Sequence, residues 1–173
     1  MINWDKVNYF SPFEFPENTS FAEPQLFYNL GEYRSLIGRK IFPSPARGAL
    51  ARMTGSPSSQ HYALGRLSTA CDIFCEGTPI QNLLSLIGSK LFNGIGIYLD
   101  TTGIDGKPWV MFHVDTRVLN DEPPVLWVVT KTNNKSNYYY PHDNPEYWSL
   151  LKHDLLYTDR IKSKGTANID PNN

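Results

Sequence analysis

Apolar residues recur at helical spacing in two stretches of the chain. Residues 24–37 carry one such stripe, formed by Leu26, Leu30, Tyr33 and Ile37. Residues 78–90 carry the other stripe, which is formed by Leu83, Leu84 and Ile87 and is continued by Leu91 just after this range. Intervals of three and four residues place each set on one side of a helix. Thr78 and Pro79 suit the cap and first turn of the second helix. The pattern therefore predicts two amphipathic helices.

Short apolar runs between turn residues predict strands. They lie at residues 40–43, 71–74, 94–99, 109–115 and 125–130. The third and fourth runs flank a turn rich in Gly and Asp, which is typical of a β-hairpin. The last run is interpreted as an added edge strand.

The remaining segments are less regular. Ser11, Pro12 and Glu14 have the spacing of a capping box on a short helical piece. We expect residues 44–52 to form a turn followed by one or two helical turns, and residues 133–144 to form a polar loop. Residues 145–156 are expected to form a closing helix, and residues 163–173 to be disordered.

These elements predict a single α+β domain, with a small, mostly antiparallel sheet flanked by helices. We divide the chain into an N-terminal lead-in (1–24), a main domain (25–130) and a C-terminal extension with a disordered end (131–173).

Composition and charge argue against several classes of function. The net charge is −1 and no run of Lys or Arg is present, so nothing predicts nucleic-acid binding. No segment approaches the ~20 apolar residues of a membrane span. The N-terminus lacks a basic segment followed by an apolar run, so no signal peptide is expected. Cys71 and Cys75 lack the spacing of a zinc–thiolate motif, and we interpret them as small buried residues.

Polar residues within apolar strands indicate the candidate chemistry. Asp72 and His113 each interrupt such a strand, and His61 precedes the first of them. An isolated carboxylate or imidazole in such a place requires a partner, and a metal ion can serve as one. Two His and one Asp would leave a fourth zinc position for water. The alternative is a His–Asp pair buried in the core. The metal site requires the strand at 71–74 to lie beside the strand at 109–115.

Several motifs resemble the D-alanyl-D-alanine peptidase and hedgehog-type zinc peptidases, particularly the small bacteriophage forms. The resemblance covers roughly residues 9–130. It rests on Ser59-Gln60-His61, Gly65, Ala70-Cys71-Asp72-Ile73, Gly94-Ile95-Gly96-Ile97-Tyr98 and Phe112-His113-Val114-Asp115-Thr116-Arg117. The segments 9–15 and 36–44 are similar to the lead-in of that family.

The resemblance implies that His61, Asp72 and His113 bind Zn²⁺. It also implies an arginine that holds the substrate, for which Arg47 and Arg52 are both candidates. Two features depart from the family pattern. Residues 66–69 resemble an insertion between the first two ligands, and Val110 stands where many members have a general base.

Asp115 is the acid nearest to His113 and, two residues away, lies on the same strand face. Three roles are open to it. It could accept the proton of the attacking water, orient a metal ligand, or pair with Arg117 as a structural group.

The leading hypothesis is a zinc peptidase that cleaves peptidoglycan peptides next to a D-amino acid. It would be made in the cytoplasm and act at the cell wall after lysis, or be carried in a phage particle. A second hypothesis is a phage virion or assembly protein that keeps the fold with weak or lost catalysis and has phage structural proteins as partners. A third is a metal-free binding module. None of them includes nucleic acid or a membrane as a partner.

Overall fold

A six-stranded sheet and two α-helices form the body of the protein. The computed structural model describes residues 2–103, 105–119, 123–133 and 135–140. The helices are α1 (Pro24–Ile37) and α2 (Pro79–Ser89), and the strands are β1 (Ile41–Pro43), β2 (Ala70–Cys75), β3 (Gly94–Thr102), β4 (Pro108–Asp115), β5 (Val125–Thr132) and β6 (Lys135–Tyr139). Three 3-10 helices precede them, at Trp4–Lys6, Pro12–Glu14 and Thr19–Phe21. The predicted α+β fold is confirmed.

The strand order is β1-β2-β4-β3-β5-β6. Neighbouring strands pair antiparallel except β3 and β5, which are parallel. The predicted hairpin is the β3–β4 pair. The strand that carries Asp72 pairs with the strand that carries His113, which is the arrangement that the metal site requires.

Both predicted helices are confirmed. Gly38, at the end of α1, adopts the left-handed conformation with φ 60°, which glycine adopts without steric cost. At the start of α2, the Thr78 side chain accepts a hydrogen bond from the Gln81 backbone amide. Thr78 therefore caps that helix as expected.

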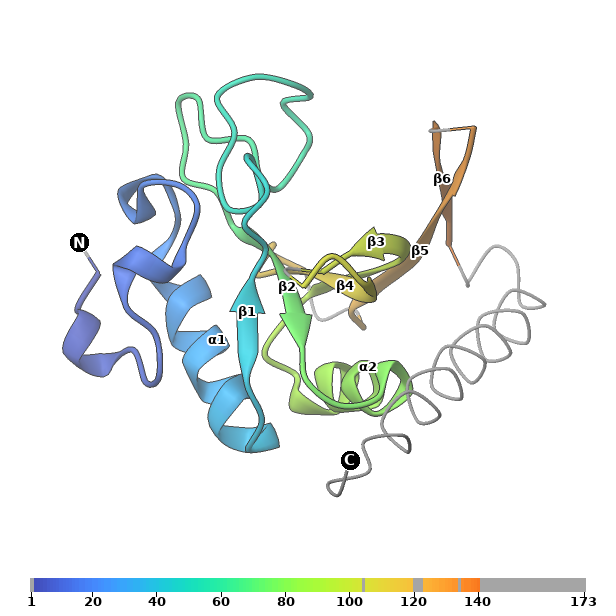
Figure 1. Cartoon of the computed structure of the whole chain (residues 1–173). Helices are drawn as coiled ribbons and strands as arrows, with labels where there is room; N and C mark the ends of the chain where they lie inside the picture. The colour runs from blue at the N-terminus through green and yellow to red at the C-terminus, as the bar shows by residue number, and fades with distance from the viewer. Residues whose placement is uncertain (1, 104, 120–122, 134, 141–173) are drawn as a thin grey trace.

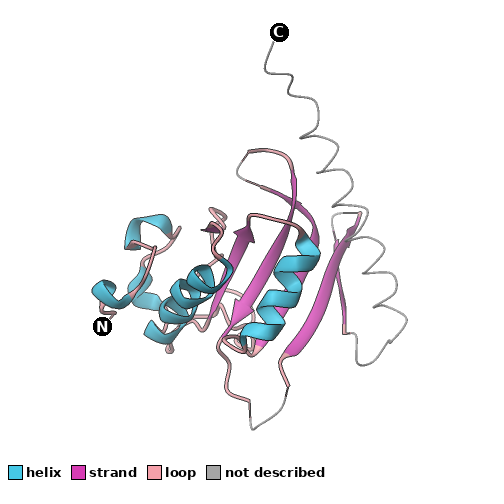
Figure 2. Ribbon diagram, turned by 90° about the horizontal axis from the view of Figure 1, so that it is seen from below, coloured by secondary structure: helices cyan, strands magenta, loops and turns pink. Residues whose placement is uncertain are grey.

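The two helices cover the same face of the sheet (Figures 1 and 2). Side chains alternate along each strand, so every second residue points to these helices. The buried cluster on that side includes Ile73, Ile95, Ile97, Phe112, Val114 and Val128. The opposite face of the sheet is left for polar chemistry.

The N-terminal segment packs into the same core. The Phe15 ring lies 4.9 Å from the Phe27 ring of α1 and 6.2 Å from the Trp4 ring, measured between centroids. The Ser11 amide donates to Glu14 Oε1 at 2.8 Å, as the capping box predicts.

Three local predictions are wrong. Residues 44–52 form turns and bends rather than a helix. Gly48 has φ 87°, and the amides of Gly48 and Leu50 donate to the Glu17 carboxylate. These amides bind a side chain in place of helical carbonyls.

The other two errors concern the last strands. Strand β5 is not an edge strand, because it lies between β3 and β6. Residues 135–139, expected in a loop, form β6, whose backbone pairs with β5. Sheet pairing overrides the polar composition of this segment.

The predicted helix at 145–156 and the predicted disorder at 163–173 lie outside the described residues. Within the described part of the chain, neither helix has the length and apolarity needed to cross a membrane.

Candidate metal centre

Three side chains offer ligand atoms at one point on the open face of the sheet. Asp72 of β2 lies directly opposite His113 of β4, and His61 comes from the loop before β2. His61 Nε2 lies 2.9 Å from His113 Nδ1 and 3.2 Å from Asp72 Oδ1, and the last two atoms are 3.1 Å apart. The structure therefore brings together the three residues predicted as metal ligands.

The donor set fits a metal ion. Ligand atoms about 2.0–2.1 Å from a tetrahedral zinc would lie roughly 3.3 Å from one another, close to the observed separations. Burial raises the pKa of the Asp72 carboxyl, but hydrogen bonds with His113 and His61 outweigh it and hold that pKa well below its ordinary value. Asp72 is therefore ionised at neutral pH and could serve as an anionic ligand. Two imidazoles and one carboxylate could hold Zn²⁺ and leave a coordination position open.

The loop that carries His61 is fixed by its backbone. The His61 carbonyl accepts from the Arg52 amide at 2.7 Å, and the neighbouring Gln60 carbonyl accepts from the Thr69 amide at 3.0 Å. Ser68 is fully buried and exchanges backbone hydrogen bonds with Phe21 and Glu23 of the N-terminal segment. Residues 66–69, which resemble an insertion, thus attach the His61 loop to the N-terminal segment.

Asp115 lies behind His113, away from the three ligand atoms. Its Oδ2 is 3.0 Å from His113 Nε2, the nitrogen opposite the one offered to a metal. Arg117 donates to both Asp115 carboxylate oxygens, with Nε at 2.8 Å from Oδ1. Asp115 is 0% exposed. This geometry matches a group that orients a metal ligand, and Arg117 in turn pairs with it.

The charge of Asp115 is set by these neighbours. Burial raises the pKa of this carboxyl, but the hydrogen bonds from Arg117 and His113 outweigh it and lower the pKa to about 2. An ionised Asp115 accepts from His113 Nε2–H, which leaves the Nδ1 lone pair free for a metal.

Two glycines of β3 make room for this arrangement. A Cβ atom at Gly94 would lie 2.2 Å from Asp115 Oδ2, and one at Gly96 would lie 2.5 Å from the Trp127 ring. The Trp127 ring therefore lies over β3, with its centroid 5.0 Å from that of His113. Sequence reasoning missed both glycines as site residues. Their alternation within a strand of β-branched residues was the available signal.

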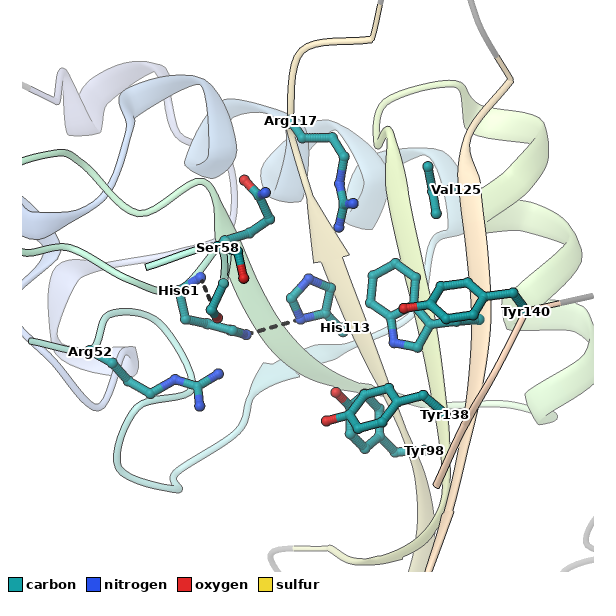
Figure 3. A pocket seen from close by; sticks show the side chains of 12 residues that line it. Arg52, Ser58, His61, Tyr98, His113, Arg117, Val125, Tyr138 and Tyr140 are labelled. Carbon is teal, nitrogen blue, oxygen red and sulfur yellow. Dashed lines mark hydrogen bonds between the residues drawn. The ribbon is translucent and has the colours of Figure 1, made fainter. Parts of the chain in front are cut away.

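A cavity of about 230 Å³ lies over the candidate centre. His61 and His113 line it, together with Trp127, Tyr98 and Tyr138. Figure 3 shows Arg52 and Arg117 on different sides of the two imidazole rings. An elongated polar substrate could therefore meet a cation on either side of the metal.

The structure distinguishes the two arginine candidates. Arg52 lines the cavity, whereas Arg47 is exposed and does not line it. Val110 is buried in the core cluster under the helices. Position 110, which the resemblance would assign to a general base, therefore faces away from the cavity.

Comparisons of this chain with protein-family models, with curated proteins and with solved structures found no match.

Proposed function

We propose that this protein is a zinc peptidase that hydrolyses a peptide bond next to a D-amino acid in peptidoglycan peptides. The observation that carries the proposal is the meeting of His61 Nε2, Asp72 Oδ1 and His113 Nδ1 beside an open cavity. The resemblance of the motifs around these residues gives the substrate class. Zn²⁺ bound there would polarise the scissile carbonyl and lower the pKa of a water molecule.

The other residues hold the ligands and the substrate. Asp115 fixes the orientation of His113 through Nε2. The Arg52 guanidinium faces the cavity (Figure 3) and would bind a substrate carboxylate by paired hydrogen bonds. Trp127 and Tyr98 form an apolar wall that would exclude water from one side of the peptide.

The test combines metal analysis with product analysis. Purified protein should hold one zinc ion per chain and release peptides from purified sacculi, as measured by mass spectrometry. Asp72→Ala and His113→Ala should lose both properties. Glu32→Gln, an exposed position on α1 on the far side of the sheet, is the matched control and should keep both. Zinc-free protein that still released peptides would contradict the proposal.

A second function is favoured by one observation. Among the described residues that line the cavity, none is an Asp or a Glu, so a free general base is missing from its wall. A phage virion or assembly protein that keeps the zinc site for architecture would have this composition. Stoichiometric zinc without any product from sacculi would support this second function.

A further inference from the structure

The described residues that line the cavity include several hydrogen-bond donors but no free carboxylate. Asp115 is enclosed behind His113, and Asp72 is one of the three candidate ligands. The described lining residues that carry a phenol hydroxyl are Tyr98, Tyr138 and Tyr140. A hydrogen-bond donor for the reacting carbonyl must therefore be sought among the arginines, serines, Gln60 and these tyrosines.

Tyr98 has the most direct position among the tyrosines. Gly96 lies opposite His113, and Tyr98 follows two residues later on β3. It therefore points to the same sheet face as His113, two residue pairs farther along the strands. Figure 3 shows the Tyr98 and Tyr138 rings together, with their hydroxyls directed into the cavity near His113.

The surroundings of Tyr98 hold its hydroxyl in place. Its side chain interacts with those of Trp127 and Tyr138. Trp127 is itself fixed over Gly96, where no side chain could be accommodated. Burial raises the pKa of Tyr98 well above its ordinary value. The hydroxyl thus stays protonated at neutral pH and can only donate to a developing anion.

We propose that Tyr98 is a further catalytic residue, whose hydroxyl donates a hydrogen bond to the scissile carbonyl oxygen as that oxygen becomes negative. This inference rests on the proposed peptidase function. The water oxygen forms a bond to the carbonyl carbon, and the π pair of the C=O bond moves to the oxygen that Tyr98 contacts. The C–N bond then breaks as that pair returns, and the amine nitrogen receives a proton from the water. Tyr98 keeps its own proton throughout.

Tyr98→Phe removes the hydroxyl and keeps the ring. With muropeptides released from sacculi by a muramidase as substrate, kcat should fall about 100- to 1,000-fold, as for loss of one oxyanion donor. The KM value should change less than about threefold, because a hydrogen bond made only in the transition state does not bind the ground state. The zinc content should stay at one per chain. Tyr28→Phe on α1, on the other side of the sheet, is the matched control and should behave as wild type.

A binding measurement provides a second readout. A phosphinate analogue of the cleaved peptide carries the negative oxygen permanently, and calorimetry should show it bound about 100-fold more weakly by zinc-loaded Tyr98→Phe than by wild type. A variant with wild-type kcat, or with wild-type phosphinate affinity, would overturn the role of Tyr98 and leave the peptidase function intact. Zinc-loaded wild type that cleaves no muropeptide would overturn both proposals.

Discussion

The two ring nitrogens of His113 have separate tasks. Nδ1 lies beside the other two candidate ligand atoms, and Nε2 lies 3.0 Å from Asp115. Because Asp115 is also held by Arg117, the imidazole is fixed in both orientation and tautomer. The affinity of the candidate site for a metal ion should therefore depend on Asp115, a residue that lies away from the three ligand atoms.

Asp115→Asn should lower zinc affinity about 10- to 100-fold, the usual cost of losing such an orienting partner. The amide keeps the size of the carboxylate but loses its charge. Competition with a chelator of known zinc affinity would measure the change. Asp100→Asn, on an exposed position of β3, serves as the control. Unchanged zinc affinity in Asp115→Asn would show that Asp115 has only a structural role beside Arg117.

The two candidate arginines should differ in their effect on substrate binding. Arg52→Ala should raise the KM for muropeptides about tenfold or more, because a charge-assisted hydrogen bond to a carboxylate contributes roughly 1.5–3 kcal/mol. Arg47→Ala removes an exposed charge of the same loop that does not line the cavity. It should leave KM unchanged. The reverse result, in steady-state kinetics, would assign the substrate to Arg47.

Individual site residues were predictable from the sequence where a polar residue stands within an apolar strand. Asp72 and His113 stand out as polar residues in apolar strands, and His61 shortly before the first of these strands completes a set of two His and one Asp. Trp127 and Tyr98 were not predicted, because an aromatic residue in a strand is equally suited to a core. Only the register of β3 with β4 and β5 shows that both lie on the open face.

At the scale of elements, β3 lies beneath the Asp115 carboxylate and the Trp127 ring. Gly94 lies opposite Asp115, and Gly96 lies opposite both His113 and Trp127. The space above this strand is occupied by side chains from its neighbours. Strand β3 thus serves as a platform for groups that β4 and β5 supply.

Gly96→Ala should displace the Trp127 ring, because the added Cβ would lie 2.5 Å from it. We expect kcat/KM on muropeptides to fall at least tenfold and tryptophan fluorescence to shift, with stability lowered by about 1–3 kcal/mol. Gly88→Ala in α2 is the control, since a Cβ there meets no atom within 4 Å. Wild-type fluorescence and activity in Gly96→Ala would mean that Trp127 is not fixed by contact with β3.

Helices were predictable where apolar residues form a complete stripe at helical spacing, as in α1 and α2. The segment at 44–52 has helical composition, but its amides bind the Glu17 carboxylate, some thirty residues earlier. Strand β6 forms because β5 presents an unpaired edge to it. The Glu17 contact is far away in the sequence, and the β5–β6 pair is a hairpin whose second strand is too polar to show an apolar alternation. Periodicity therefore revealed neither.

At the scale of the whole molecule, the covered face of the sheet determines stability. Cys75 of β2 lies in the core cluster under the helices. Burial raises the pKa of its thiol from 9.0 to about 12, against a smaller lowering by Arg39. The folded protein therefore keeps this thiol neutral at pH values where the unfolded chain ionises it.

The free energy of unfolding should fall as pH rises, because the unfolded chain ionises the Cys75 thiol before the folded protein does. The stability that comes from burying the neutral Cys75 thiol is fully present below about pH 9. It is lost at about 1.4 kcal/mol per pH unit as pH rises from about 9 toward 12. Urea unfolding between pH 8 and 11 would measure it. Cys75→Ala should be less stable at pH 8 but show a slope smaller by about that amount. Equal slopes in the two proteins would contradict the raised pKa.

The sheet is a single layer of backbone with core on one side and chemistry on the other. Neighbouring positions such as Phe112 and His113 are therefore under different constraints. Phe112 is constrained by the stability of the fold, and His113 by the proposed chemistry. A substitution of His113 should abolish the proposed hydrolysis and leave the abundance of folded protein nearly unchanged, while a substitution of Phe112 should lower abundance and hydrolysis together. In a saturation mutagenesis experiment scored separately for abundance and for hydrolysis, β4 should show two interleaved sets of sensitive positions. A lineage could lose the reaction and keep the scaffold, or regain the reaction, by substitutions confined to one of these sets.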